Sequence, residues 1–128
     1  MKPNIKSANI KSVTALGGTK VINKAGKSLG KIEDFVVDLT TGRIAYAVLS
    51  FGAFMATDKL FAIPIKALKL DLEKETFILD VYKEQLENAP GFDKNHWPDM
   101  ADPEWGIKVH SFYGVVPYEE GSGNPFNL

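Results

Sequence analysis

The two histidines of the chain, together with nearby carboxylates, are the residues that could bind a metal. His96 and His110 lie in a stretch that also contains Asp93, Asp99 and Asp102. Imidazole nitrogens and carboxylate oxygens are ligands of transition metals. The two histidines, however, lack the helical i, i+4 spacing or other tight spacing of a preformed site. We therefore interpret them as structural and predict no metal site.

Paired carboxylates and a strand serine are the next candidates for chemistry. Asp34 and Asp38 have the same parity on one expected strand, where they could act as a general acid and base. Turn capping and solvation explain two aspartates at the end of a strand better. Ser50 lies inside an apolar strand, whereas a serine nucleophile requires a sharp turn. The sequence thus predicts no catalytic residue, and we expect a protein that is not an enzyme.

The segment Gly26-Lys27-Ser28-Leu29-Gly30-Lys31 has the composition of a phosphate-binding loop. It lacks the spacing of such loops, and no expected helix follows it to hold an anion. Turn formation is the better interpretation, and we predict no cofactor. The absence of cysteine also excludes disulfides, thiolate catalysis and cysteine-ligated zinc or iron–sulfur centres.

Composition indicates an ordinary globular domain. The chain has 128 residues, of which 45% are hydrophobic and 24% charged, and its formal net charge is −1. This length suits one domain with a real core. The charge creates no global field for nucleic acid or anionic membranes, so we expect no nucleic-acid partner. Apolar runs are too short to cross a bilayer and the N-terminus lacks a secretion signal, so we expect no membrane insertion and a cytoplasmic location.

Three β-like runs organise the chain, at residues 20–23, 31–39 and 43–51. Turns at Gly26, at Gly30 and from Asp38 to Gly42 separate them. Within residues 31–39, Ile32 and Phe35 have opposite parity although both should be buried. A bulge near Glu33-Asp34 would place them on the same side. Residues 43–51 are apolar on both faces, which predicts a strand covered on both sides.

The second half of the chain predicts further strands and one short helix. A strand at residues 59–63 ends at Pro64, which lacks an N–H for the ladder. A hairpin at residues 69–81 offers the inward-facing candidates Leu70, Leu72, Phe77, Leu79 and Val81. Residues 83–88 predict a short helix. From residue 90 onward, large aromatic side chains stand among Asp, Pro and Gly, which indicates a mostly irregular wrap packed on the sheet.

The order of these features resembles the PRC-barrel family. The residues that match are 26–38, 41–52 and 59–64, with the glycines, the Asp38–Gly42 turn and Pro64 at the family's intervals. The resemblance covers about residues 17–81. The tail resembles that of small stand-alone bacterial members, which are similar to the cytoplasmic domain of the photosynthetic reaction-centre H subunit.

The resemblance implies an all-β fold with a small six-stranded antiparallel barrel. The family also includes the second domain of a ribosome-maturation factor. The chain shows neither the transmembrane helix of the H subunit nor the extra N-terminal β-domain of the ribosome factor. The expected organisation is a flexible arm at residues 1–18, a barrel at 19–89 and a C-terminal extension at 90–128 packed on it.

The resemblance implies a domain that docks on other proteins and catalyses no reaction itself. We therefore expect a non-enzymatic protein–protein interaction module that self-associates, as a homodimer, and binds an unidentified protein partner. The expected contact residues are Phe51, Phe54, Met55, Tyr46, Trp97 and Trp105. The alternative is a small-ligand-binding protein or enzyme with a pocket between barrel and tail, lined by Tyr46, Trp97, Trp105 and Tyr113. A ribosome- or RNA-processing-associated adaptor is a third hypothesis, although no Lys/Arg cluster supports it.

Overall fold

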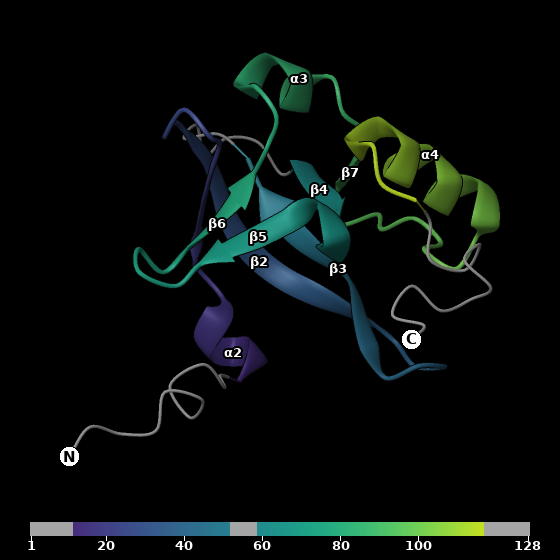
Figure 1. Ribbon diagram of the computed structural model, residues 1–128. Coiled ribbons are helices and arrows are strands. Elements are labelled where there is room, and N and C mark those ends of the chain that lie inside the picture. The colour runs from purple at the N-terminus through teal and green to yellow at the C-terminus, as the bar shows by residue number, and fades with distance from the viewer. Residues whose placement is uncertain (1–11, 52–58, 117–128) are drawn as a thin grey trace.

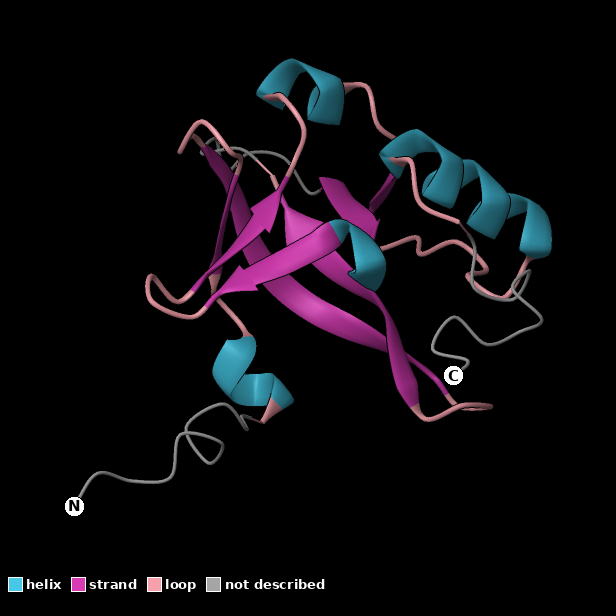
Figure 2. Ribbon diagram, viewed as in Figure 1, coloured by secondary structure: helices cyan, strands magenta, loops and turns pink. Residues whose placement is uncertain are grey.

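A computed structural model describes residues 12–51 and 59–116 of the chain. One mixed sheet of seven strands dominates it, with short helices at its margins (Figure 2). The strand order is β5-β6-β1-β2-β3-β4-β7. The elements in chain order are α2 (Val13–Leu16), β1 (Lys20–Ile22), β2 (Ser28–Asp38), β3 (Arg43–Ser50), β4 (Lys59–Pro64), the 3-10 helix η1 (Ile65–Ala67), β5 (Leu68–Asp71), β6 (Thr76–Leu79), α3 (Lys83–Glu87), β7 (Gly91–Asp93) and α4 (Pro103–Tyr113).

The β2–β3 hairpin is the longest ladder in the sheet. Its register runs from Lys31 opposite Ser50 to Asp38 opposite Arg43, and it shifts between Ile32 and Asp34. This is the position where the conflict of parity predicted a bulge. Ile32 and Phe35 consequently pack into the same core cluster. In Figure 1 the turn end of this hairpin extends beyond the rest of the sheet.

The prediction of a β-rich chain is confirmed, but that of six antiparallel strands is wrong in two respects. The sheet has a seventh strand, β7, whose three residues are too few to show any periodicity in the sequence. Strand β1 also pairs with β6 in parallel, Val21 opposite Phe77. Within the described residues no ladder joins the edge strands β5 and β7, so hydrogen bonds do not close the sheet.

Two smaller predictions also need correction. Gly30 was expected in a turn, but it lies inside β2, opposite Val21 of β1. Glycine is required at position 30 because the backbones of β2 and β3 approach closely there, and a Cβ would clash with the Ser50 carbonyl oxygen. Leu70 and Leu72 were expected to face inward, yet they are 44% and 56% exposed. Leu70 lies on the edge strand β5 and Leu72 in the turn that follows it, and neither belongs to a core cluster.

The C-terminal extension is more regular than predicted. An 11-residue helix, α4, stands where a mostly irregular wrap was expected. Asp102 caps its N-terminus, Pro103 occupies its first turn, and Gly114 ends it in the left-handed conformation at φ 72°. The preceding β7 pairs with β4, so the extension also contributes a strand to the sheet.

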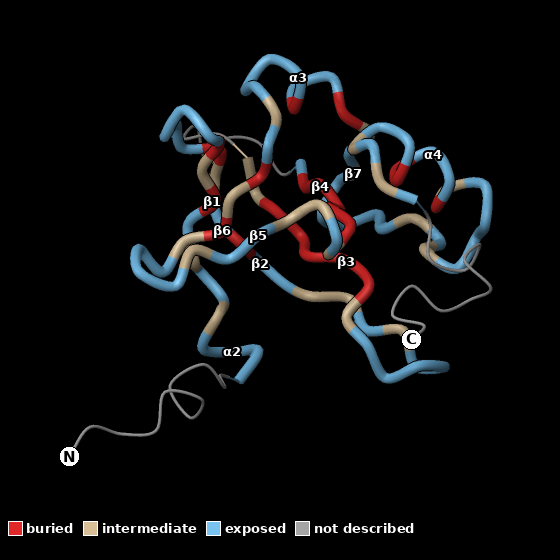
Figure 3. Tube along the Cα trace, viewed as in Figure 1, coloured by how far each residue is buried: buried red, intermediate tan, exposed pale blue. Residues whose placement is uncertain are grey.

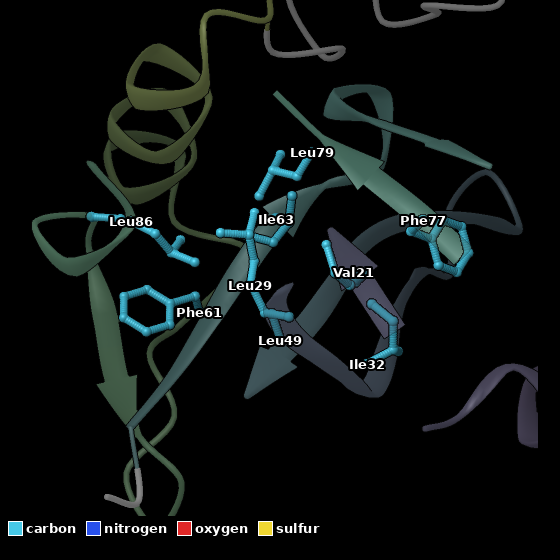
Figure 4. Packing of buried hydrophobic residues seen from close by; sticks show 11 residues of the cluster. Val21, Leu29, Ile32, Leu49, Phe61, Ile63, Phe77, Leu79 and Leu86 are labelled. Carbon is cyan, nitrogen blue, oxygen red and sulfur yellow. The ribbon is translucent and has the colours of Figure 1, made fainter. Parts of the chain in front are cut away.

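The core consists of two clusters on either side of β3 and β4, where burial is concentrated (Figure 3). Figure 4 shows the larger cluster, in which Phe61, Ile63 and Leu49 meet side chains of β1, β6 and α3. The smaller cluster joins the opposite face to α4 through Ala45, Tyr46, Ala62 and Val109. The expected cover for the second face of β3 therefore comes from α4. No helix in the described part of the chain has the length and apolarity needed to span a membrane.

Candidate docking site

A groove of about 590 Å3 lies between the β2–β3 hairpin and the start of α4. One wall comes from the end of β2 and its turn, the floor from β3, and the other wall from the segment that leads into α4. The lining residues are Val36, Val37, Asp38, Leu39, Thr40, Ala45, Tyr46, Met100, Ala101, Asp102, Pro103 and Gly106. Most of them are apolar, which suits a binding surface for apolar side chains.

The hairpin wall is held in place by the chemistry of its turn. The Asp38 carboxylate accepts a hydrogen bond from the Thr40 N–H at 2.8 Å, and the Asp38 carbonyl accepts one from the Gly42 N–H at 2.7 Å. Gly42 has a φ of 76°, which permits this tight return of the chain. The turn leaves Leu39 90% exposed and Val37 44% exposed. Two apolar side chains therefore stand at the mouth of the groove.

The opposite wall is set by two successive caps. The Asp99 carboxylate accepts a hydrogen bond from the Ala101 N–H, and the Asp102 carboxylate accepts one from the Glu104 N–H, each at 3.0 Å. These bonds orient residues 99–102 and start α4 at Pro103. The Gly106 carbonyl accepts a hydrogen bond from Nδ1 of the buried His110 at 2.7 Å, which places the ring proton on Nδ1. These bonds define the start of α4 locally, and packing of Val109 and Trp105 against Tyr46 and Ala62 holds the helix on the sheet.

The floor is rigid because aromatic rings pack beneath it. Tyr46 is 5% exposed, and its ring centroid lies 5.2 Å from that of Trp105 in an edge-to-face arrangement. His110 meets the same tyrosine at 5.5 Å with the planes inclined by 65°. Such contacts stabilise by about 0.5 to 1.5 kcal/mol beyond area burial. These contacts fix the position of the Tyr46 ring at the base of the groove.

The groove has an acidic character at its α4 side. Its lining includes Asp38 and Asp102 but no lysine or arginine. Arg43 lies opposite Asp38 in the hairpin register and offsets that charge. At α4, Asp99, Asp102 and Glu104 together exceed the roughly half positive charge of a helix N-terminus. A ligand with apolar and cationic groups would complement this surface.

The predicted contact residues are only partly brought together. Tyr46 and Trp105 meet under the groove, but Phe51 packs against Phe61 in the larger core cluster at a centroid distance of 5.8 Å. Trp97 is 43% exposed; its ring centroid lies 5.0 Å from that of Phe92 with the planes inclined by 58°, and its Nε1–H donates to the Lys94 carbonyl. Phe54 and Met55 lie outside the described residues.

The groove is lined mostly by residues other than those predicted for a ligand pocket. Of Tyr46, Trp97, Trp105 and Tyr113, only Tyr46 lines the groove. Tyr113 packs against both core clusters, and burial raises the pKa of its phenol. Its hydroxyl is buried without a hydrogen-bond partner among the described residues. The described chain also contains no group of three or more His, Cys, Asp or Glu arranged to hold a metal.

Sequence reasoning missed Leu39, Met100 and Pro103 as lining residues. Leu39 is a large apolar residue inside the polar turn Asp38-Leu39-Thr40-Thr41-Gly42, but a single exposed apolar residue is common on protein surfaces and does not by itself mark a site. The segment at residues 100–103 carried a helix-start signal in Asp102-Pro103-Glu104. Neither signal says that the two segments meet.

Comparison with known proteins agrees with this β-rich architecture. The model of the family described as PRC-barrel domain matches residues 9–86, which is more than half of the chain. No curated protein matches the sequence. The matched region ends within α3, so it includes the β2–β3 hairpin but not the α4 side of the groove. The chain belongs to the PRC-barrel domain family.

Proposed function

We propose that this PRC-barrel protein is a non-enzymatic docking module that binds a segment of another protein in the groove between the β2–β3 hairpin and α4. The observation that carries the proposal is the apolar groove of about 590 Å3 with Leu39 90% exposed at its mouth. Leu39 and the half-exposed Val37 adjoin the apolar lining, and a contiguous apolar patch of this kind marks an interaction site. The partner segment carries apolar side chains flanked by lysine or arginine, to match the acidic α4 side.

The roles of the groove carboxylates support binding over catalysis. Asp38 and Asp102 both accept hydrogen bonds from backbone N–H groups and thereby hold the two walls. A carboxylate engaged in a cap is poorly placed to move protons during a reaction. The apolar lining offers contact area and excludes water, which is what a docking surface requires.

Self-association is a further part of this proposal. Phe54 and Met55 are adjacent in the sequence between Gly52 and Asp58, and two-fold contacts are the commonest way that soluble proteins cover such apolar pairs. Because α4 already covers the second face of β3, the loop at residues 51–57 is the element that argues for a homodimer.

A displayed library of random dodecapeptides tests the docking function. The full chain should enrich peptides that combine Leu, Ile, Val or Phe with Lys or Arg. The test variant is Leu39→Lys, which alters a side chain already in solvent. Its circular dichroism spectrum should match that of the unmodified chain, which shows that the variant is folded. Loss of the enriched peptides with this variant supports the groove as the site. Equal enrichment by both proteins, or no enrichment at all, contradicts the proposal.

The volume of the groove favours one second candidate. Cavities of about 300 to 1,000 Å3 are typical of small-molecule sites, and this groove has about 590 Å3. A small apolar ligand with a cationic or hydrogen-bond donor group would fit its lining. Fragment screening by NMR separates the two functions: fragments that shift the Ala45 and Tyr46 amides at low micromolar concentration favour a ligand carrier.

A further inference from the structure

The pairing of β1 with β2 sets the direction of the chain back to Gly18. Strand β1 is antiparallel to β2, with Lys20 opposite Lys31. The pairing continues outside β1, because the Ile32 N–H donates to the Thr19 carbonyl and the Gly18 N–H donates to the Ile32 carbonyl. Followed toward its N-terminus, the chain therefore runs alongside β2 in the direction of the β2–β3 turn, where the groove lies.

The distance is within reach of this segment. Val36, the nearest lining residue along β2, is four residues beyond Ile32, or about 13 Å at the rise of a strand. Helix α2 separates Gly18 from Ser12, and residues 1–11 precede it outside the described residues. Eleven residues in extended conformation span up to about 36 Å. Even after a detour around α2, the segment is long enough to enter the groove.

The chemistry of this segment complements the groove. Residues 1–11 contain Lys2, Lys6 and Lys11 and no Asp or Glu, with Ile5 and Ile10 as apolar side chains. This is the combination of apolar and cationic groups that suits the apolar lining and the carboxylates at the start of α4. The other terminal segment, residues 117–128, has Glu119 and Glu120 and no lysine or arginine, so the same carboxylates would repel it.

We infer that residues 1–11 bind in the groove of their own chain and compete with the partner segment for it. The inference rests on the proposed docking function and names an intramolecular ligand for the same site. Attachment to the sheet gives such a segment an effective concentration on the order of 1 mM. A segment with an intrinsic dissociation constant of about 0.1 mM would then occupy about nine of ten grooves. The arm acts as a built-in competitor that a stronger partner must displace.

The first test compares arm variants of the full chain by ¹H–¹⁵N NMR. Ile5→Ser with Ile10→Ser removes both apolar anchors and keeps every charge, whereas the control Ser7→Ala with Asn9→Ala keeps the anchors. The first variant should shift the amides of residues 36–40 and 100–106, and the control should not. If neither variant moves these amides, or if both move only residues next to the arm, the inference is wrong.

The second test adds a fluorescent peptide with the sequence of residues 1–11. It should bind the Ile5→Ser/Ile10→Ser chain about tenfold more tightly than the unmodified chain, whose own arm competes. Asp102→Asn keeps the oxygen that caps α4 and removes one charge, so peptide binding should weaken about threefold and depend less on salt. Equal affinity for the unmodified and arm-variant chains overturns the inference.

The outcomes separate this inference from the docking function. If library peptides bind at the groove but the arm peptide does not, the arm inference fails and the docking function stands. If neither binds, both fail. If the amide differences between unmodified chain and arm variant disappear on dilution, the arm of a second copy fills the groove, which overturns the intramolecular assignment.

Discussion

Gly30 and Gly42 both have positive φ angles, but the structure uses them for different reasons. Gly30, at 136°, lies where β2 approaches the carbonyl of Ser50 too closely for a Cβ. Gly42, at 76°, has open space around the position of a Cβ and needs only the left-handed conformation of its turn. Glycine is thus required at position 30 because a Cβ would clash, and at position 42 because of the backbone conformation.

Alanine at these two glycines should therefore have unequal effects. Gly42→Ala should lower the free energy of unfolding by about 1 to 2 kcal/mol, the cost of a left-handed L-residue. Gly30→Ala should cost about 3 kcal/mol or more, because β2 and β3 must also move apart. Urea denaturation followed by circular dichroism measures both values. Similar midpoints for the two variants would contradict the close approach at Gly30.

At Tyr113, in contrast to the two glycines, a substitution should raise the stability of the fold. Its hydroxyl is buried without a partner among the described residues, while its ring lies 4.9 Å from that of Phe112. Tyr113→Phe keeps the ring and removes an unsatisfied polar group, so the variant should be more stable by about 1 kcal/mol. A loss of stability in thermal and urea unfolding would reveal a hydrogen bond to the hydroxyl.

The same tyrosine predicts a dependence on alkaline pH. Burial raises the pKa of the Tyr113 phenol, so the folded chain keeps this proton above pH 10 while the unfolded chain releases it. The unfolded state is then favoured, and stability should fall as the pH rises beyond about 10. Urea midpoints at pH 9 and pH 10.5 should fall less for Tyr113→Phe than for the unmodified chain.

Helix α4 packs the C-terminal extension on one face of the sheet, in addition to the pairing of β7 with β4. Val109 is fully buried against Tyr46 and Ala62, whereas Ile107, on the same helix, is 46% exposed. Val109→Ala should lower the free energy of unfolding by about 2 kcal/mol. Ile107→Ala should change it by less than about 0.5 kcal/mol. Equal losses in urea denaturation would show that α4 packs in a different orientation.

Predictability from sequence differed between elements for physical reasons. The β2–β3 hairpin and its bulge could be predicted because alternation and turn chemistry are local. Helix α4 was missed because exposed Ile107 and Phe112 and buried Gly106 blur its apolar stripe, although its caps were readable. The parallel pairing of β1 with β6 depends on contacts between distant segments and leaves no local pattern.

The candidate site was predictable only in its floor. Tyr46 and Trp105 were predicted as contact residues because the chain has more apolar and aromatic side chains than one small barrel can hide. Their rings meet each other, and contact with a partner stays a prediction. The groove above them arises because the turn at Leu39 meets the start of α4, and this juxtaposition depends on tertiary packing. Such a site requires the fold before it can be recognised.

For the whole molecule, self-association remains a prediction that solution experiments can decide. Phe54→Glu with Met55→Lys should convert a dimer to a monomer without unfolding, because the exchange places charges in an apolar contact. Sedimentation across a concentration series measures the association, with circular dichroism as the folding control. A monomeric unmodified protein at high micromolar concentration would show that the loop serves another partner.

The position of β1 between β6 and β2 has a consequence for how the chain acquires its structure. The three residues of β1 pair with β2 on one side and with β6 on the other. In the sequence, β6 follows β1 only after β2, β3, β4 and β5. The hairpins can form as soon as their own residues are available, but this pairing must close a long loop first. During synthesis, β1 therefore keeps one hydrogen-bonding edge open until β6 leaves the ribosome. Within the described residues, the β5–β6 hairpin is hydrogen-bonded to the rest of the sheet only through β1, so the amides that pair β1 with β6 should lose their protection from hydrogen exchange together.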